Sequence, residues 1–316
     1  MKTIIRAAMA AAIVLGSGMA GAQQPRSTSG LQRLLDAELA RFPAKAGVWV
    51  KHLATGEEAG VRGDETFNSA SVIKIPVMVL AFQMADKGAL SLGERVTISA
   101  ADVRGGSGIF RYNDPGLQPT LRDVVLQMII TSDNTATDIA IAKVGGVDRV
   151  NAWLRETGYG DALRLSMTTA ALFAKYSALP QTANRNEKTN ADRSYWLGEM
   201  TPRGTGRMLE AIQLCADGKA TTAAIASQKS CADMMRMMRA QQSGARRLPH
   251  FLNVPVAHKT GDFPPVLAND VGVVFARSGP IVISFFTNAI EGPYAEAEDR
   301  IGRVAQLIVA YFDGAQ

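Results

Sequence analysis

The sequence contains three short groups of residues whose side chains could carry out nucleophilic catalysis. In the first, Ser71 and Lys74 lie three residues apart in the segment Ser71-Val72-Ile73-Lys74. A helix places two such side chains on one face, and an amine held against a serine hydroxyl can accept its proton. Burial would lower the pKa of the lysine from its reference value of about 10.4 toward neutrality. The same spacing occurs by chance about once in a chain of this composition, so the pair needs support from other residues.

The second group is the tripeptide Ser132-Asp133-Asn134. It lies where one predicted helix ends and the next begins, so its side chains can point into a cleft. A hydroxyl at such a position can pass a proton to a leaving group, and a side-chain amide can bind a substrate carbonyl. The alternative is an ordinary Ser/Asp/Asn helix cap.

The third group is Lys259-Thr260-Gly261, at the end of a predicted strand. The lysine offers a positive charge for a substrate carboxylate, and the threonine offers a hydroxyl. The glycine leaves room for a ligand beside the strand. The alternative is a plain strand end with a turn glycine.

Together, the three groups resemble the S-x-x-K, S-D-N and K-T-G motifs of the class A β-lactamases and penicillin-binding proteins. They occur in the family's order, and each falls on the expected element: a helix start, a loop between helices and a late strand. The resemblance extends roughly from Leu31 to the C-terminus. It implies a helical domain beside an α/β sandwich, with Ser71 as the residue that a β-lactam or a related acyl compound acylates.

The resemblance also implies roles for the neighbours of Ser71. Lys74 is the expected base or proton partner, and Ser132 the proton shuttle. Substrate contacts are expected from Asn134, which would bind an amide, and from Lys259 and Thr260, which would hold the substrate carboxylate. The oxyanion hole would use the backbone N–H groups of Ser71 and Asp262.

Class A enzymes also need a glutamate on the Ω loop to activate the water that removes the acyl group. Glu187, in Arg185-Asn186-Glu187, is the best candidate, with Asn190 sharing the water and Glu199 in reserve. The motif is one residue shorter than in the family, and we interpret the stretch from Leu165 to Asn184 as an insertion. The alternative for Glu187 is an exposed surface charge, the usual fate of a glutamate.

Two further departures from the family concern substrate range. Asp262 follows the glycine of the third motif, where the family prefers a small or hydroxyl residue. We expect this carboxylate to contact the substrate and to disfavour some acidic substrates. The sequence offers no clear arginine for carboxylate binding on the next strand, although Arg203 and Arg207 are candidates. The pair Arg246-Arg247 is expected to be solvent-exposed surface.

Periodicity predicts an α+β fold. Residues 31–42 have the apolar spacing of a helix, and 46–52 with 57–62 form a hairpin. A block of helices follows, including one with the capping box Thr120 to Asp123 and one that starts at Thr201-Pro202. Residues 254–259, 270–277 and 281–288 are late strands, and 296–312 a closing helix. We expect a β-lactamase-like five-stranded antiparallel sheet flanked by helices, an all-helical domain, and the site in the cleft between them.

The predicted organisation has four parts. Residues 1–22 are expected to be a signal peptide, since a positive start, a short apolar run and a small-residue cleavage site follow one another. Residues 23–66 and 226–316 build the α/β lobe, and residues 67–225 the helical lobe with an extended Ω-loop region. Export predicts a secreted, periplasmic protein without stable membrane insertion. In that compartment Cys215 and Cys231 either form a disulfide or are two small buried residues.

Composition excludes other functions. Loss of Lys2 and Arg6 with the signal peptide reduces the formal net charge from +5 to +3, and no basic stripe with aromatic residues suggests nucleic acid. With only three histidines, we expect no metal site, and the chemistry needs no cofactor. We therefore expect a monomeric serine β-lactam hydrolase. The alternatives are a D,D-peptidase or penicillin-binding protein, an esterase or amidase on the same scaffold, and a non-catalytic β-lactam sensor.

Overall fold

The computed structural model describes residues 29–219 and 225–314 of the 316-residue chain. The predicted signal peptide, residues 1–22, lies outside the described residues. Within the described ranges no helix is long and apolar enough to cross a membrane.

The centre of the fold is the five-stranded antiparallel sheet that the sequence predicts. Its strand order is β2-β1-β8-β7-β6, so the early hairpin pairs with the last strand of the chain. The two hairpin strands meet through the turn at Thr55-Gly56, where Gly56 has a φ of +76°, a conformation that favours glycine. The strands are β1 (Lys45–His52), β2 (Glu58–Val61), β6 (Val256–Phe263), β7 (Leu267–Ala276) and β8 (Gly279–Asn288).

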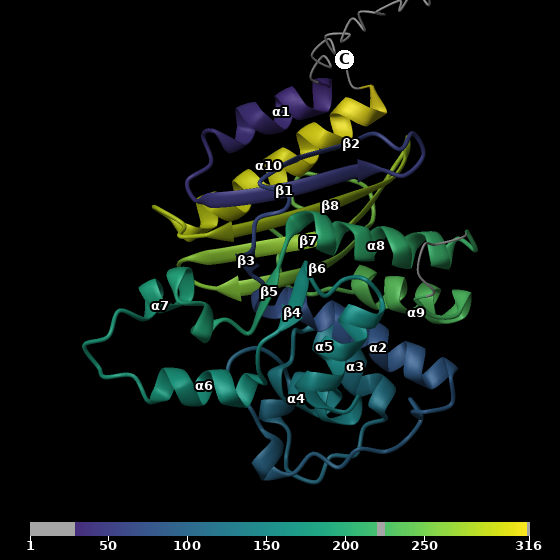
Figure 1. The fold of residues 1–316 in the computed structure, drawn as a ribbon, viewed down its shortest axis with the longest axis vertical. Coiled ribbons are helices and arrows are strands. Elements are labelled where there is room, and N and C mark those ends of the chain that lie inside the picture. Colours follow the sequence, from purple (N-terminus) through teal and green to yellow (C-terminus); the bar gives the residue numbers. More distant parts are fainter. Residues whose placement is uncertain (1–28, 220–224, 315–316) are drawn as a thin grey trace, which may run out of the picture.

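Helices cover both faces of this sheet (Figure 1). On one face lie α1 (Gly30–Leu39) and α10 (Tyr294–Asp313), and on the other α8 (Pro202–Ala216) and α9 (Gln228–Arg239). Because successive side chains of a strand point to opposite faces, Val48 and Val50 of β1 join the core under α1 and α10, while Trp49 joins the core under α8. The α+β prediction is therefore confirmed.

The helical part of the molecule lies beyond the α8 and α9 layer (Figure 1). Its central helix, α2 (Lys74–Asp86), is buried along most of its length. Three helices surround it: α3 (Leu121–Ile130), α4 (Asn134–Lys143) and α5 (Gly146–Glu156). Helix α3 begins with the predicted capping box, in which Thr120 and Asp123 bond to each other's backbone N–H.

Sequence periodicity did not indicate a second, small sheet of order β3-β5-β4. Its strands, of two or three residues, are β3 (Phe67–Asn68), β4 (Leu163–Leu165) and β5 (Gly198–Met200). Between β4 and β5 the chain forms α6 (Thr169–Ser177) and α7 (Arg185–Ala191), which project from the body in Figure 1. Strands this short carry too few side chains to show alternation.

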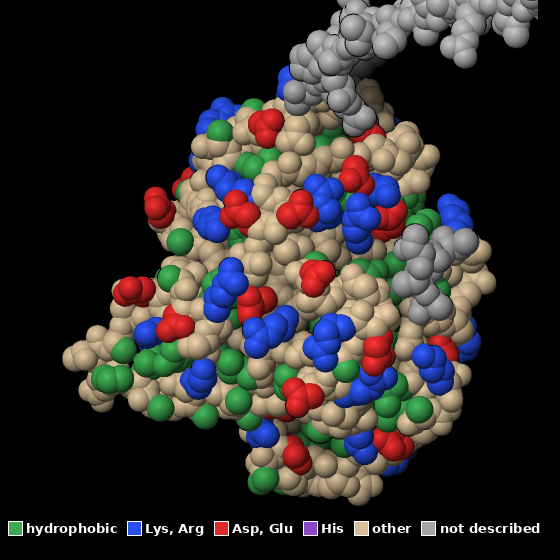
Figure 2. Space-filling view, in the orientation of Figure 1, with side chains coloured by type: hydrophobic (Ala, Val, Ile, Leu, Met, Phe, Trp, Pro, Cys, Tyr) green, Lys and Arg blue, Asp and Glu red, His purple; other side chains and the backbone are tan. Residues whose placement is uncertain are grey.

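A disulfide joins Cys215 of α8 to Cys231 of α9, with a Cα–Cα distance of 5.9 Å. Of the two possibilities that the sequence leaves open for these cysteines, the cross-link is confirmed. It ties together the two helices that cover one face of the sheet. Over the face of the molecule seen in Figure 2, acidic and basic side chains are interspersed rather than gathered by sign.

Candidate active site

Ser71 opens into a cavity of about 470 Å³ where the sheet, the helical part and α6 meet. Residues from several helices, strands and loops line this cavity, as is usual for a ligand site. Its polar lining includes three of the predicted site residues besides Ser71. The lining residues are Asn68, Ala70, Ser71, Gly106, Ser107, Thr131, Ser132, Asn134, Thr169, Leu172, Phe173, Tyr195, Leu197, Ser243, Asp262, Phe263 and Pro264.

The turn that presents Ser71 is held in an unusual backbone conformation. Ser71 lies in a short 3₁₀ helix, Ala70–Ile73, directly before α2, and Ala70 has a φ of +41°. Residues other than glycine hold such a conformation only when their surroundings support it. Here the Ala70 N–H donates to Asn68 Oδ1 at 3.1 Å, and Asn269 Nδ2 donates to the carbonyls of Asn68 and Ser69. Local strain at the nucleophile is thus supported from two strands.

Strand β6 passes close to the same turn. A Cβ added to Gly261 would lie 2.6 Å from the Ser69 carbonyl oxygen, which explains why the third motif requires glycine here. This close approach brings the backbone of Asp262 beside the Ser71 turn. Both residues line the cavity.

Below the nucleophile lies a buried polar group that we call the floor cluster: Lys74, Ser132, Asn134 and Lys259. Lys74 Nζ donates to three oxygens, the Ser132 carbonyl at 2.7 Å, Asn134 Oδ1 at 3.0 Å and Ser132 Oγ at 3.2 Å. Lys259 Nζ donates to the same Ser132 Oγ at 3.0 Å. The three motifs, distant in sequence, therefore meet at one hydroxyl.

Ser132 reaches this position because its own backbone is unusual. Its φ is +55°, between the end of α3 and the cap of α4, where Asp133 Oδ1 accepts from the Ala136 N–H. Asn134 is held by a second bond, from its Nδ2 to the Gly105 carbonyl at 3.0 Å. The tripeptide thus caps a helix and supplies the floor cluster, so the two interpretations of it are compatible.

Burial and like charge change the pKa of both lysines. Burial lowers the pKa of Lys74 well below the usual value for a lysine, and the Lys259 charge lowers it further. Burial also lowers the pKa of Lys259, to about 8, against the opposing effect of Asp262. The positive charge of Arg247 also lowers the pKa of Lys259, because a like charge disfavours the charged form. A neutral amine at Lys74 is the form that can accept a proton from a serine hydroxyl.

The polar side chains at the end of β6 form a second group. Thr260 Oγ1 lies 2.7 Å from Ser243 Oγ, and Asp262 follows two residues later. Arg247 contacts Asp262 and Glu298, and its side chain is only 2% exposed. The prediction that Arg247 is a surface residue is wrong, since two carboxylates compensate its charge inside the fold. Sequence reasoning missed Ser243 and the burial of Arg247, because both belong to a loop without periodicity.

A further, mostly apolar part of the cavity lining, which we call the outer wall, consists of Thr169, Leu172 and Phe173 of α6, with Tyr195 and Leu197. The stretch from Leu165 to Asn184, which the sequence marks as an insertion, thus supplies part of the site itself. Ring contacts hold the wall to the sheet, because Tyr176 packs on Tyr195 and on Phe263, each at 5.2 Å between ring centres.

Glu187 does not reach this cavity. It is exposed on α7 and lines a separate surface hollow with Asn184, Lys188 and Asp192. The anchor of α7 is instead Thr189, whose carbonyl accepts from Asn68 Nδ2 at 3.0 Å and whose hydroxyl lies 2.7 Å from the Tyr176 hydroxyl. The structure therefore gives Glu187 the position of a surface charge.

Asn190, which was predicted to share the water with Glu187, also lies outside the cavity lining. Asn190 Oδ1 accepts from the Ala289 N–H at 2.9 Å, and its carbonyl accepts from Asn288 Nδ2 at 3.1 Å. Asn190 thus fastens the end of α7 to the end of β8. Its side chain is committed to the backbone and does not line the cavity.

The reserve candidate and the proposed arginines likewise lie outside the cavity lining. Glu199 pairs with Arg164 at 2.9 Å and with Arg193 at 3.3 Å. Arg203 pairs with Asp64 and Glu58, and neither Arg203 nor Arg207 lines the cavity. In the described part of the chain, Asp262 is the only carboxylate that lines the Ser71 cavity.

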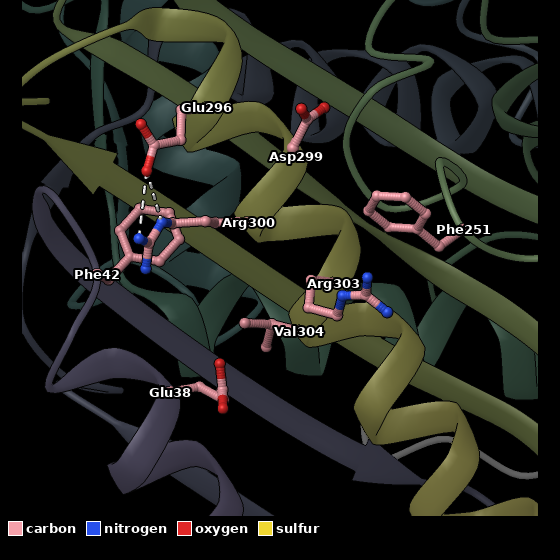
Figure 3. Close-up of a pocket in the computed structure, with 8 residues that line it drawn as sticks. All are labelled: Glu38, Phe42, Phe251, Glu296, Asp299, Arg300, Arg303 and Val304. Carbon is pink, nitrogen blue, oxygen red and sulfur yellow. Dashed lines mark hydrogen bonds and ion pairs between the residues drawn. The ribbon is translucent and has the colours of Figure 1, made fainter.

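A different hollow, of about 310 Å³, lies between α1 and α10 on the far side of the sheet. Figure 3 shows Arg300 turned toward Glu296 beside the ring of Phe42, with Asp299 and Arg303 further along α10. Its lining contains no serine, cysteine, lysine or histidine. It offers no nucleophile comparable to Ser71. No cluster of metal-ligating side chains occurs in residues 29–219 and 225–314 either.

The fold and the floor cluster together define the class of active-site serine enzymes with a lysine one turn after the nucleophile. A family model described as the beta-lactamase enzyme family matches residues 29–312. The chain belongs to this family. The prediction of a hydrolase family that acts on β-lactams is thereby confirmed.

Individual relatives are similar at low identity over nearly the whole length. The beta-lactamase VEB-1 of Pseudomonas aeruginosa is 24% identical over 301 residues, which are 92% of each chain. The crystal structure of a beta-lactamase from Sphaerobacter thermophilus has a TM-score of 0.70 and 28% identity, and covers 89% of this chain and 95% of its own. The structure of PBP-A has a TM-score of 0.74 and 25% identity, and covers 90% and 97%.

Proposed function

We propose that the protein opens the amide of β-lactams by transferring the acyl group to Ser71. The observation that carries this proposal is the convergence of Lys74 and Lys259 on Ser132 Oγ beside the Ser71 cavity. A strained amide needs a nucleophile, a base for its proton and an acid for the leaving nitrogen. We assign these roles to Ser71, Lys74 and Ser132, of which the last two belong to the buried floor cluster.

In the proposed reaction, Lys74 loses a proton and one of its three donated hydrogen bonds, and the neutral amine then accepts the proton of the Ser71 hydroxyl as its oxygen attacks the carbonyl carbon. The backbone N–H groups of Ser71 and Asp262 stabilise the oxyanion that forms. Collapse of this intermediate breaks the carbon–nitrogen bond. Ser132 gives its proton to the departing nitrogen and recovers one from Lys74, so that protons balance over the step.

We also propose the contacts with the substrate. Lys259 and Thr260 are fully buried and are not lining residues, but they contact the lining through Ser132 and Ser243. We propose that Asn134 binds the amide of the acyl side chain, since this residue lines the cavity. Lys259 and Thr260 bind the substrate carboxylate, which lies on the leaving-group side of the scissile bond. The lysine supplies charge, and the hydroxyls of Thr260 and Ser243 supply hydrogen bonds.

Release of the acyl group is proposed to be the slow step. The sequence hypothesis required Glu187 to activate water, but that side chain lies outside the cavity. Asp262, the carboxylate that does line it, is bound to Arg247 and Tyr294. The remaining base near an acyl group on Ser71 is the Lys74 amine. Hydrolysis without a dedicated carboxylate forgoes a contribution of about 10²–10⁴ in rate.

This feature favours a second candidate function, that of a penicillin-binding protein or D,D-peptidase, which acylates readily and deacylates β-lactams slowly. A related structure supports the comparison, since a mutant of PBP-A was solved as an acyl-enzyme complex with penicillin G. That chain is 25% identical to this one with a TM-score of 0.69. Both candidates share the acylation step and differ in the lifetime of the adduct.

Intact-mass spectrometry over time, after mixing with benzylpenicillin, tests the proposal. The expected result is an adduct of one penicillin that appears in the wild-type protein, is absent in Ser71→Ala, and decays slowly. Fast clearance with consumption of free penicillin would identify an efficient β-lactamase and would contradict slow release. A wild-type protein without any adduct, or an adduct that persists in Ser71→Ala, would overturn the nucleophile assignment.

We also propose that the protein is exported as a monomer after removal of residues 1–22. The proposal rests on the signal-like N-terminal sequence and on the disulfide between Cys215 and Cys231, which persists in oxidising compartments. Cell fractionation followed by N-terminal sequencing would find mature protein beginning at Gln23 outside the cytoplasm. Cytoplasmic, unprocessed protein would contradict export, and size-exclusion chromatography of the mature form tests the monomer.

A further inference from the structure

Asp262 places a negative charge at the part of the cavity where the substrate's own charge is expected. Thr260 and Asp262 are two residues apart on β6, so their side chains point to the same face of the strand. Ser243 completes this group, with its Oγ 2.7 Å from Thr260 Oγ1. The side chain of Asp262 is 31% exposed and lines the cavity with Ser243 and Ser71.

The positive charge nearest to Asp262 is already neutralised. Arg247 lies between two carboxylates, those of Asp262 and Glu298, and donates through Nη1 to the Asn269 carbonyl at 2.8 Å. One cation between two anions leaves the group with an excess negative charge. Because Arg247 is buried and its donors are engaged, it is not available to bind a substrate carboxylate.

Only one side of the Asp262 carboxylate is used in these contacts. Arg247 and Tyr294 both bond to Oδ1, and within the described residues Oδ2 has no hydrogen-bond donor. An ionised carboxylate has acceptor capacity on both oxygens. The free oxygen therefore repels a carboxylate and accepts hydrogen bonds from N–H groups that approach Thr260 and Ser243.

We propose that Asp262 selects acyl donors that carry a neutral or positively charged group, rather than a carboxylate, beside Thr260 and Ser243. This inference rests on the proposed acylation of Ser71. The preferred substrates are then uncharged or amine-bearing lactams, esters and amides. Lys259 still attracts anions, so carboxylate substrates are slowed rather than excluded.

Two substrates that differ only in this charge test the proposal: benzylpenicillin and its methyl ester. We would measure the second-order rate of Ser71 adduct formation by intact mass for wild type and Asp262→Asn. The expected result is that the ratio of the acid rate to the ester rate rises by about tenfold or more in the variant, because a like-charge repulsion is removed. Asparagine keeps the size of the side chain and removes its charge. Thermal unfolding confirms that the variant is folded, and Asp262→Ser serves if it is not.

Asp299→Asn is the control. Asp299 pairs with Arg246 and His250 rather than with Arg247, and it does not line the cavity, so its loss should change the acid-to-ester ratio by less than about threefold. An unchanged ratio in both Asp262 variants would overturn the inference, as would an equal shift in Asp299→Asn. Failure of the wild type to form an adduct with either compound would instead refute acylation itself. The two failures are therefore distinguishable.

Discussion

The outer wall lines the Ser71 cavity and the floor cluster borders it through Ser132 and Asn134, but the two groups are held in place by different contacts. Lys74, Ser132, Asn134 and Lys259 are almost fully buried and bonded to one another. The wall is held by ring contacts through Tyr176 and by hydrogen bonds from Thr169 to Asp138 and to the Asn134 carbonyl. The acids considered for acyl release, Glu187 and Glu199, lie outside the cavity lining. The difference separates two steps of the proposed chemistry: groups for forming an acyl-enzyme are preorganised, and groups for hydrolysing it are not.

The largest expected effect is on the floor cluster. Lys74→Met removes the proposed base and should slow Ser71 acylation by about 10²–10⁴-fold, measured as adduct formation by intact mass. Lys175→Met, on α6, is the control, because its amine is exposed and donates to the Ser194 carbonyl rather than to the floor cluster. A Lys74 variant that acylates within about tenfold of wild type would move the base to another group.

A carboxylate introduced into the outer wall should speed the hydrolysis of the acyl group on Ser71. Leu172→Glu puts an acid into the lining of the Ser71 cavity, where it could activate water. We expect the preformed penicillin adduct to decay about 10–100-fold faster. Leu172→Gln has the same shape without the charge and should retain the slow decay. Equal adduct lifetimes in the two variants would show that the wall does not face the acyl carbon.

The pH dependence should distinguish the two lysines. Acylation requires neutral Lys74, so its rate rises with pH through the lowered pKa of that residue. Lys259, with a pKa of about 8, loses its charge at higher pH, so the rate with benzylpenicillin should fall about tenfold per pH unit above that value. The methyl ester carries no charge, and its rate should stay level. Parallel profiles for the two compounds would contradict a role for the Lys259 charge.

The smallest expected effect is at Glu187. Because its side chain is exposed and lines a different hollow, Glu187→Gln should change acylation and adduct lifetime by less than about twofold. The lifetime is the decisive measurement, since the sequence hypothesis predicts a large increase in it. An adduct that lasts about tenfold longer or more in this variant would restore Glu187 as the base and imply that α7 moves during the reaction.

The floor cluster was predictable from the sequence because its three short motifs, taken together, resemble those of a known family. Ser71 and Lys74 are one turn apart, Asp133 is a helix cap, and Gly261 is required by a close approach that permits no Cβ. The five main strands were also predictable from β-branched alternation and turn residues. Each motif is itself a short run of neighbouring residues, although the approach that requires Gly261 is made to the distant Ser69 carbonyl.

The outer wall was not predictable for the opposite reason. Whether α6 or α7 contributes to the cavity depends on long-range contacts, such as Tyr176 with Phe263 and Thr189 with Asn68. The local sequence Arg185-Asn186-Glu187 resembles the family motif, but helix α6, which precedes it, lines the cavity instead. The burial of Arg247 likewise depends on Asp262 and Glu298, which lie 15 and 51 residues away along the chain.

The disulfide between α8 and α9 has a consequence for how the protein is produced. It closes a loop of 16 residues, for which chain entropy predicts a stabilisation of about 3 kcal/mol. Protein made in a reducing cytoplasm would lack this cross-link, since such compartments keep thiols reduced. Two preparations of identical sequence, one from an oxidising and one from a reducing host, would therefore differ in melting temperature and in shelf life while carrying the same floor cluster.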